Sequence, residues 1–200
     1  MTTVTVLAYG AGNTASVQFA LERLGATVRL TDEPLEVAEA ERLILPGVGA
    51  AGYAMERLQT LGLVAPIRAF TRPLLGVCLG QQLLFDRSQE GQGVDLLGLI
   101  PGEVSAIEPA PSRPVPHMGW SRLTQRRDDP LLDGVEDGAW AYFVHGFVCP
   151  DGPATIAAAD YGGPVPAVVR SANRWGCQFH PERSAQAGAR ILQNFLEIAA

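Results

Sequence analysis

The chain has 200 residues, a formal net charge of −6 at pH 7 and a hydrophobic content of 47%, which is ample for one buried core. All 15 basic residues are arginine, so the chain has no lysine for Schiff-base chemistry or for a Walker-type phosphate loop. The acidic balance argues against non-specific binding of nucleic acid.

The cysteines and the hydropathy pattern bear on compartment and cofactors. Cys78, Cys149 and Cys177 are an odd number, and their spacing is typical neither of a metal site nor of a disulfide framework. The sequence contains no signal-peptide pattern and no long apolar span. We therefore expect a single domain over residues 1–200 in a reducing cytoplasm, with no metal, no cofactor and no membrane partner.

The first 78 residues alternate strand-like and helix-like segments. Residues 3–9 read as a buried strand, and residues 10–26 turn and then carry helical periodicity until Gly25, a plausible helix stop. The alternation continues with strands at 26–31, 41–50 (ending in a Pro-Gly turn) and 73–78, and with helices at 51–60 and 63–70. This order predicts a parallel sheet with helices on both faces, whose ligands bind beyond the carboxyl ends of the strands.

The pattern changes near residue 98. Short strand-like runs separated by Gly and Pro predict an antiparallel annex, and these runs are 102–107, 120–124, 140–148, 154–160 and 165–172. Residues 174–180 form another strand, and the tail 187–200 predicts a closing helix that buries Ile191, Leu192, Phe195 and Ile198. The proline-rich segment 109–116 is expected to be a rigid loop. The expected fold is therefore α/β, a mostly parallel central sheet with helices on both faces plus this annex.

Cys78 stands where an apolar run meets a helical pattern. Gly76 precedes it by two residues, Gly80 follows it by two, and residues 79–85 have the spacing of a helix start. Small residues at these positions allow the tight turn of a nucleophile elbow, with sulfur in place of a serine hydroxyl. The positive end of the following helix would favour thiolate over thiol. The alternative is a buried structural cysteine, because free cysteine is often buried.

A cysteine nucleophile requires a base, and the chain has three histidines. His180 ends an apolar strand and Glu182 follows two residues later, so the carboxylate can hold one imidazole nitrogen while the other faces the sulfur. His117 and His145 lie among aromatic and apolar residues, where each could be a structural histidine. The residues favour His180 as the base, and His117 and His145 remain alternative candidates for that role.

An oxyanion hole would complete such a site. Its first donor is expected to be the backbone N–H of Leu79, directly after the nucleophile. The second is expected from the glycine-containing loop 45–49 at the same sheet edge, since glycine permits close approach to a substrate. An ordinary strand-to-helix turn is the alternative interpretation of that loop.

The segments "GVCLGQQLLF" (76–85) and "QFHPE" (178–182) together resemble the class I glutamine amidotransferases. The resemblance implies a flavodoxin-like α/β fold and a Cys-His-Glu triad that hydrolyses the side-chain amide of glutamine. It assigns Cys78 as the nucleophile, His180 as general base and acid, and Glu182 as the residue that orients the histidine.

Segments 9–17, 45–55, 116–120 and 142–147 are more narrowly similar to the glutaminase subunits of imidazole glycerol phosphate synthase, and the likeness runs from Tyr9 to Phe195. In that family the glutaminase forms a heterodimer with a cyclase subunit, a (β/α)8 barrel, and passes it ammonia for histidine biosynthesis. The cyclase product is imidazole glycerol phosphate, released with an aminoimidazole carboxamide ribonucleotide.

The resemblance also implies binding residues. It places glutamine contacts at Gly47, Gln82 and the backbone around His145 and Gly146, and an oxyanion donor at Val48 that becomes available when the Gly47–Val48 peptide rotates. The partner face is implied at Asn13, Trp120 and Tyr142. Three residues depart from the family pattern without touching the triad: Gln81, Gly146 and Arg183.

Three other functions remain open on the sequence. One is a glutaminase that serves another synthase, such as anthranilate synthase, although "PHMGW" and "YGAGN" argue against it. The second is a free-standing cysteine hydrolase of γ-glutamyl peptides, which would be active alone. The third is a non-catalytic binding protein that has kept the fold, although the intact Cys78, His180 and Glu182 count against it.

Overall fold

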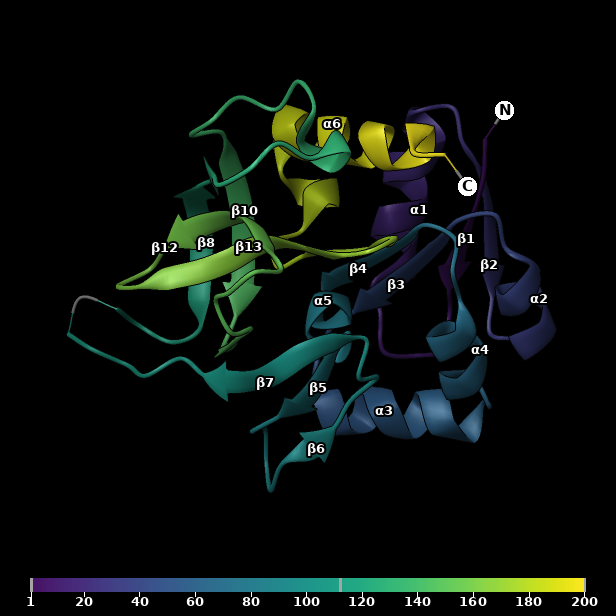
Figure 1. Ribbon diagram of the computed structural model, residues 1–200, viewed down its shortest axis with the longest axis horizontal. Coiled ribbons are helices and arrows are strands. Elements are labelled where there is room, and N and C mark those ends of the chain that lie inside the picture. The colour runs from purple at the N-terminus through teal and green to yellow at the C-terminus, as the bar shows by residue number, and fades with distance from the viewer. Residues whose placement is uncertain (1, 112, 200) are drawn as a thin grey trace.

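An eight-stranded sheet runs through the computed structural model of the protein, which describes residues 2–111 and 113–199 (Figure 1). Neighbouring strands are parallel from β2 to β14, and the remaining strands add to that edge in antiparallel orientation. In spatial order the strands are β2 (Thr27–Thr31), β1 (Thr3–Leu7), β3 (Leu43–Gly47), β4 (Leu74–Cys78), β14 (Arg174–Cys177), β13 (Pro164–Ser171), β12 (Thr155–Asp160) and β9 (Thr124–Gln125).

Helices cover both faces of the parallel part, as the sequence predicted. Because side chains alternate along a strand, Ile44 of β3 packs into one apolar cluster while Leu43 and Leu45 pack into the other. Helices α1 (Thr14–Arg23) and α6 (Ala185–Glu197) cover the first face, and α3 (Ala51–Thr60) and α4 (Val64–Ala69) cover the second (Figure 1).

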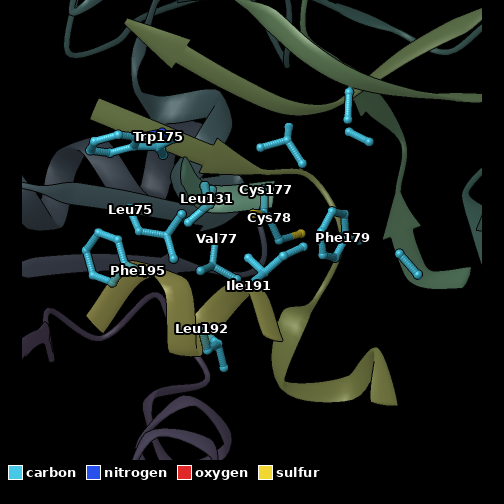
Figure 2. Close-up of a cluster of buried hydrophobic side chains, with 14 of the residues drawn as sticks. Leu75, Val77, Cys78, Leu131, Trp175, Cys177, Phe179, Ile191, Leu192 and Phe195 are labelled. Carbon is cyan, nitrogen blue, oxygen red and sulfur yellow. The ribbon is translucent and has the colours of Figure 1, made fainter. Parts of the chain in front are cut away.

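The closing helix α6 buries apolar side chains that its sequence pattern predicts. Ile191, Leu192 and Phe195 are buried against Leu75 and Val77 of β4, as Figure 2 shows. Each such side chain contributes roughly 1.5–3 kcal/mol when it leaves water. The helix therefore helps to fix the strand that carries Cys78.

The predicted antiparallel annex is present in part only. Strands β12 and β13 are not in an annex, because they extend the main sheet. Among the described strands, β8 (His117–Arg122) pairs only with β10 (Trp140–His145). A four-stranded sheet holds β11 (Phe147–Val148), β7 (Ile100–Ala106), β5 (Phe85–Ser88) and β6 (Val94–Asp95), and β5 and β7 pair in parallel.

Several boundaries differ from the sequence prediction. The helix after Cys78 is only α5 (Leu79–Leu83), and Phe85 lies in β5 instead of continuing the helix. The expected Pro-Gly turn is wrong, because Pro46 and Gly47 still belong to β3. Helix α2 (Pro34–Glu39) was not predicted, because it is too short for a clear apolar period, and neither were the 3-10 turns η1 (Pro130–Leu132) and η2 (Pro181–Arg183).

The proline-rich segment is a loop held from outside. The Tyr161 hydroxyl donates to the Pro114 carbonyl at 2.6 Å, and the Arg113 guanidinium donates to the Gly162 carbonyl at 2.8 Å. Ser112, in the middle of the segment, lies outside the described residues. Within the described part of the chain, no helix is both long and apolar enough to cross a membrane.

Candidate active site

Cys78 lies at a strained junction between β4 and α5. Its φ is +55°, in the left-handed region that non-glycine residues avoid, and it persists only where the surroundings enforce it. The glycines on either side are required by close packing: a Cβ on Gly76 would overlap the Gly80 carbonyl, and a Cβ on Gly80 would overlap the Leu45 carbonyl. The Gly-x-Cys-x-Gly pattern is thus a steric condition for this turn.

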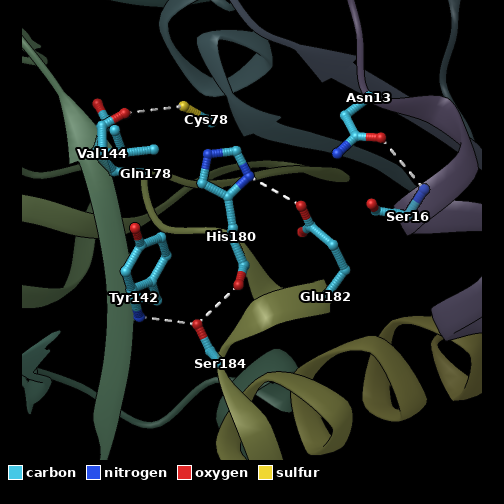
Figure 3. A network of polar contacts seen from close by, with 9 residues as sticks. All are labelled: Asn13, Ser16, Cys78, Tyr142, Val144, Gln178, His180, Glu182 and Ser184. Carbon is cyan, nitrogen blue, oxygen red and sulfur yellow. Dashed lines mark hydrogen bonds and ion pairs between the residues drawn. The ribbon is translucent and has the colours of Figure 1, made fainter. Parts of the chain in front are cut away.

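His180 and Glu182 lie beside this junction. His180 directly precedes η2, and Glu182 is the middle residue of η2. His180 Nδ1 is 2.9 Å from Glu182 Oε1, and the Glu182 side chain is only 1% exposed. His180 Nε2 is buried and has no hydrogen-bond partner among the described residues. In Figure 3 the His180 ring lies between Cys78 and Glu182, so its unpaired nitrogen is the one available to the sulfur.

The charges around His180 keep a proton on it. Burial lowers the pKa of His180, but its interactions with Cys78 and with Glu182 outweigh burial and raise that pKa from 6.5 to about 10. The ring is therefore an imidazolium at neutral pH when the sulfur carries negative charge. Such a pair supplies both a nucleophile and a proton donor.

The other two cysteines lack these features. Cys149 and Cys177 are buried in the core, and burial raises the pKa of Cys149 to about 12 and that of Cys177 still further. Sulfur reacts as thiolate, so both thiols are chemically inert at neutral pH. The sulfur of Cys78 instead faces polar groups, with the Val144 carbonyl at 3.8 Å and the Gln178 Nε2 at 4.0 Å.

A cavity of about 240 Å³ opens onto Cys78. Its walls come from the loop after β3, the elbow at Cys78, the end of β10 and the loop after β5. The lining residues are Val48, Gly49, Cys78, Leu79, Gln82, Glu90, Val144, His145, Gly146, Phe147 and His180. The volume is below the range of about 300–1,000 Å³ for drug-sized ligands, so it suits a ligand as small as an amino acid.

The structure brings most of the predicted binding residues to this cavity. Gly47 is the exception, because it lies behind the lining, paired in register with Cys78. A Cβ on Gly47 would lie 2.7 Å from the Gly80 nitrogen and 2.8 Å from the Leu79 Cβ, so a side chain there would displace the elbow. Sequence reasoning missed Glu90, whose carboxylate accepts from the Ala51 N–H at 2.6 Å. No motif surrounds Glu90, and only the folded loop places it here.

The two predicted oxyanion donors differ in their present state. Leu79 begins α5, directly after Cys78, and lines the cavity. The Val48 N–H instead donates to the Ala11 carbonyl at 2.8 Å, so it is engaged outside the cavity.

The remaining histidines form a pair of their own. His145 Nδ1 lies 2.7 Å from the Phe147 carbonyl, and its Nε2 lies 3.0 Å from His117 Nδ1. Both ring nitrogens of His145 are therefore occupied, although the residue lines the cavity. Burial lowers the pKa of both histidines to about 4, and the mutual contact of the pair adds to this for His117. Neither ring is arranged as a base for Cys78.

The predicted partner residues lie in two places. Trp120 and Tyr142 are opposite each other on β8 and β10, with ring centroids 5.8 Å apart, and Trp120 is 50% exposed. Two further exposed apolar side chains, Met118 and Trp140, lie on the same strands. Asn13 caps α1 by accepting from the Ser16 N–H at 3.3 Å, a structural role that the sequence analysis did not consider.

Known proteins are similar to this chain in sequence and in fold. The chain matches the family Glutamine amidotransferase class-I over residues 5–199. It is 52% identical over 199 residues to imidazole glycerol phosphate synthase subunit HisH of Xanthomonas euvesicatoria pv. vesicatoria, covering 100% of this chain and 99% of the relative. The identity to the subunit of the same name from Xylella fastidiosa is 52% over 200 residues, with 100% of both chains covered. A solved glutamine amidotransferase superposes with a TM-score of 0.75 at 21% identity, covering 97% of each chain.

Proposed function

The chain belongs to the class I glutamine amidotransferases, and on that premise we propose that it hydrolyses L-glutamine and delivers the ammonia to the cyclase subunit of an imidazole glycerol phosphate synthase. The observation that carries the glutaminase activity is the strained Cys78 beside the unpaired Nε2 of His180, at the mouth of a small cavity. The assignment to this synthase rests on the 52% identity, over the full length, to its HisH subunit from two organisms.

The first half of the reaction forms a thioester. The Cys78 thiolate attacks the carboxamide carbon of glutamine, and negative charge develops on the carbonyl oxygen. The Leu79 N–H, at the start of α5, stabilises that oxygen; loss of one such donor typically lowers the rate about 100- to 1,000-fold. His180 then gives its Nε2 proton to the leaving nitrogen, so ammonia departs and the thioester remains.

The second half hydrolyses the thioester. Neutral His180 takes a proton from water through Nε2, and the resulting hydroxide attacks the carbonyl carbon. Collapse of this intermediate releases glutamate and restores the thiolate beside an imidazolium. Glu182 holds Nδ1 through both steps, which keeps the ring in one orientation and stabilises its charge.

Two side chains of the cavity suit the rest of the substrate. Glu90 supplies the carboxylate among the described residues that line the cavity, and its charge complements the α-ammonium group of an amino acid. Gln82 donates from Nε2 to the Phe147 carbonyl at 3.1 Å and to Gln178 Oε1 at 3.0 Å. Both of its protons are used, so its amide oxygen is the atom left to accept from glutamine.

The state of Val48 supports a gated enzyme. A subunit that feeds a partner gains by remaining idle alone, and the Val48 N–H is held by Ala11 in this structure. Rotation of the Gly47–Val48 peptide would bring that N–H to the oxyanion, and the neighbouring Gly49, at φ +89°, gives the backbone freedom to follow. Binding of the cyclase and its ribonucleotide must favour the rotated form by about 1.4 kcal/mol for each tenfold gain in population.

The partner is proposed to dock on the outer face of β8 and β10. Exposed Met118, Trp120 and Trp140 form an apolar face there with Tyr142, and aromatic residues and methionine are enriched at protein interfaces. Asn13, at the N-terminus of α1, is proposed as a second point of contact with the partner.

The test is a glutaminase assay of the purified chain alone, with a (β/α)8 cyclase, and with cyclase plus an analogue of its ribonucleotide. We expect co-purification with the cyclase and rates that increase in that order. Equal rates in all three samples would refute the gate and favour a free-standing hydrolase. Stimulation by an anthranilate synthase partner and none by the cyclase would refute the assignment to this synthase.

A further inference from the structure

The inner side of the two-stranded sheet of β8 and β10 carries a series of hydrogen-bonded polar groups that the proposed reaction does not use. His117 and Ser121 are on the inward face of β8, opposite in direction to the exposed Met118 and Trp120. Ser121 Oγ lies 2.9 Å from His117 Nε2, and His117 Nδ1 lies 3.0 Å from His145 Nε2. A half-buried hydroxyl on β8 is thus linked through two buried rings to the glutamine cavity.

The donor and the acceptor in each of these hydrogen bonds follow from the last acceptor in the series, the Phe147 carbonyl. The Phe147 carbonyl can only accept, so His145 must carry a proton on Nδ1. Neutral His145 then accepts at Nε2, which requires a proton on His117 Nδ1. Neutral His117 in turn accepts at Nε2 from the Ser121 hydroxyl. A single arrangement of tautomers therefore satisfies all three hydrogen bonds, and the tautomer of each histidine determines the tautomer of the other.

The environment of His117 excludes other arrangements. Its ring is stacked between Phe143, with centroids 4.8 Å apart, and Tyr161, with centroids 3.9 Å apart. The two aromatic rings prevent the imidazole from turning, and burial lowers the pKa of both histidines to about 4, so both are neutral at pH 7. The Ser121 hydroxyl therefore donates to His117 Nε2, and His117 Nδ1–H donates to His145 Nε2 from a fixed position.

We propose that His117, supported by Ser121, is a positioning residue that locks His145 in its Nδ1-protonated tautomer and thereby sets the Phe147 carbonyl that holds Gln82 in the glutamine cavity. The link is direct, because that carbonyl accepts from both His145 Nδ1 and Gln82 Nε2. Gln82 also joins Gln178, whose Nε2 contacts the Cys78 sulfur. This inference rests on the proposed glutaminase function for its kinetic readout.

The first test needs no activity. The chain has three histidines, so the ¹⁵N spectrum of protein labelled at histidine contains three ring systems. At pH 7 we expect one imidazolium and two neutral rings with the proton on Nδ1. A spectrum in which His145 is charged, or carries its proton on Nε2, overturns the proposal even if the protein is an active glutaminase.

The second test separates positioning from folding. His117→Leu removes the donor to His145 and leaves the Nε2 of His145 unpaired. We therefore expect KM for glutamine to rise about tenfold, with a much smaller change in kcat. His117→Asn places an amide N–H where Nδ1 was and should restore most of the affinity. Ser121→Ala, a milder change should His117→Leu fail to fold, is expected to shift KM in the same direction and to alter the His117 ¹⁵N signals.

Tyr161→Phe is the matched control, because it keeps the ring stacked on His117 and removes only the bond to Pro114. It should leave KM and the histidine spectrum unchanged. Unaltered KM and unaltered His145 signals in both His117→Leu and Ser121→Ala would overturn the proposal. An inactive wild-type protein that shows the expected tautomers would instead refute the proposed function and leave the tautomer lock standing.

Discussion

Replacement of Glu182 by glutamine tests how much the buried carboxylate contributes through its charge. The two side chains have nearly the same shape, and the amide oxygen can still accept from His180 Nδ1 at the observed 2.9 Å. What is lost is the negative charge beside the imidazolium, in a position where the carboxylate is only 1% exposed and poorly screened.

The expected size of the effect follows from hydrogen-bond energies. A hydrogen bond to a charged group contributes about 1.5–3 kcal/mol and a neutral one about 0.5–1.5 kcal/mol, so the difference is roughly 1–1.5 kcal/mol. Since 1.36 kcal/mol corresponds to a factor of ten, Glu182→Gln should lower kcat about tenfold. His180→Asn should be more severe, because it removes the proton carrier itself.

The pH dependence gives the sharper readout. The pKa of His180 is about 10, so the imidazolium needed to protonate ammonia is lost as pH rises through that value. With a neutral partner the alkaline limb of the rate profile should move about one pH unit lower. The measurement is glutaminase rate against pH in the presence of the cyclase. Glu56→Gln, on the exposed side of α3, is the control that makes the same chemical change away from the site.

A Glu182→Gln enzyme with an unchanged rate and an unchanged alkaline limb would show that the carboxylate does not act on His180. The orienting group would then have to be sought elsewhere, and the second half of the proposed mechanism would fail with it.

Three further predictions concern the nucleophile, the elbow and the buried histidines. Cys78→Ala should abolish glutamine hydrolysis while cyclase binding persists, whereas Cys177→Ala should retain turnover; hydrolysis by the first variant in a glutaminase assay would refute the thioester. Gly80→Ala places a Cβ on a β3 carbonyl, so its Tm should fall markedly, and an unchanged Tm would refute the packing argument. The pKa values of His117 and His145 are depressed from 6.5 to about 4, so the unfolded chain binds their protons more readily. Their contribution to stability is present above about pH 6.5 and is lost as pH falls towards 4. Urea unfolding should therefore show a lower free energy at pH 5 than at pH 7 and a smaller difference in His117→Asn; an equal difference in both proteins would contradict this.

Much of the first half of the fold could be predicted because its signals are local. Helix α3 occupies the predicted residues, and β1, β2 and β4 lie within the predicted strands, since apolar period and turn residues are contained in each segment. The elbow was predictable for the same reason. Gly76, Cys78 and Gly80 are neighbours in sequence, and the clash that requires both glycines arises mainly within that turn and the strand beside it.

The second half was less predictable because strand patterns do not specify partners. Strands β10, β12 and β13 contain similar short strand-like runs, yet only β12 and β13 join the main sheet. Alternation of apolar and polar residues identifies a strand and its buried face. Which edge that strand joins depends on contacts between residues distant in sequence, and no local feature encodes it.

The sequence by itself determined the parallel α/β core, the turn at Cys78 and the spacing that lets Glu182 reach His180. Only the tertiary structure decided which histidine is free, because His145 is occupied by His117 of the paired strand and by the Phe147 carbonyl. Only the tertiary structure likewise brought Glu90 to the cavity and tied the Val48 N–H to Ala11. Local patterns specify backbone shape and burial, whereas the state of a donor or a proton depends on the atom that meets it, and in this site those atoms come from distant segments.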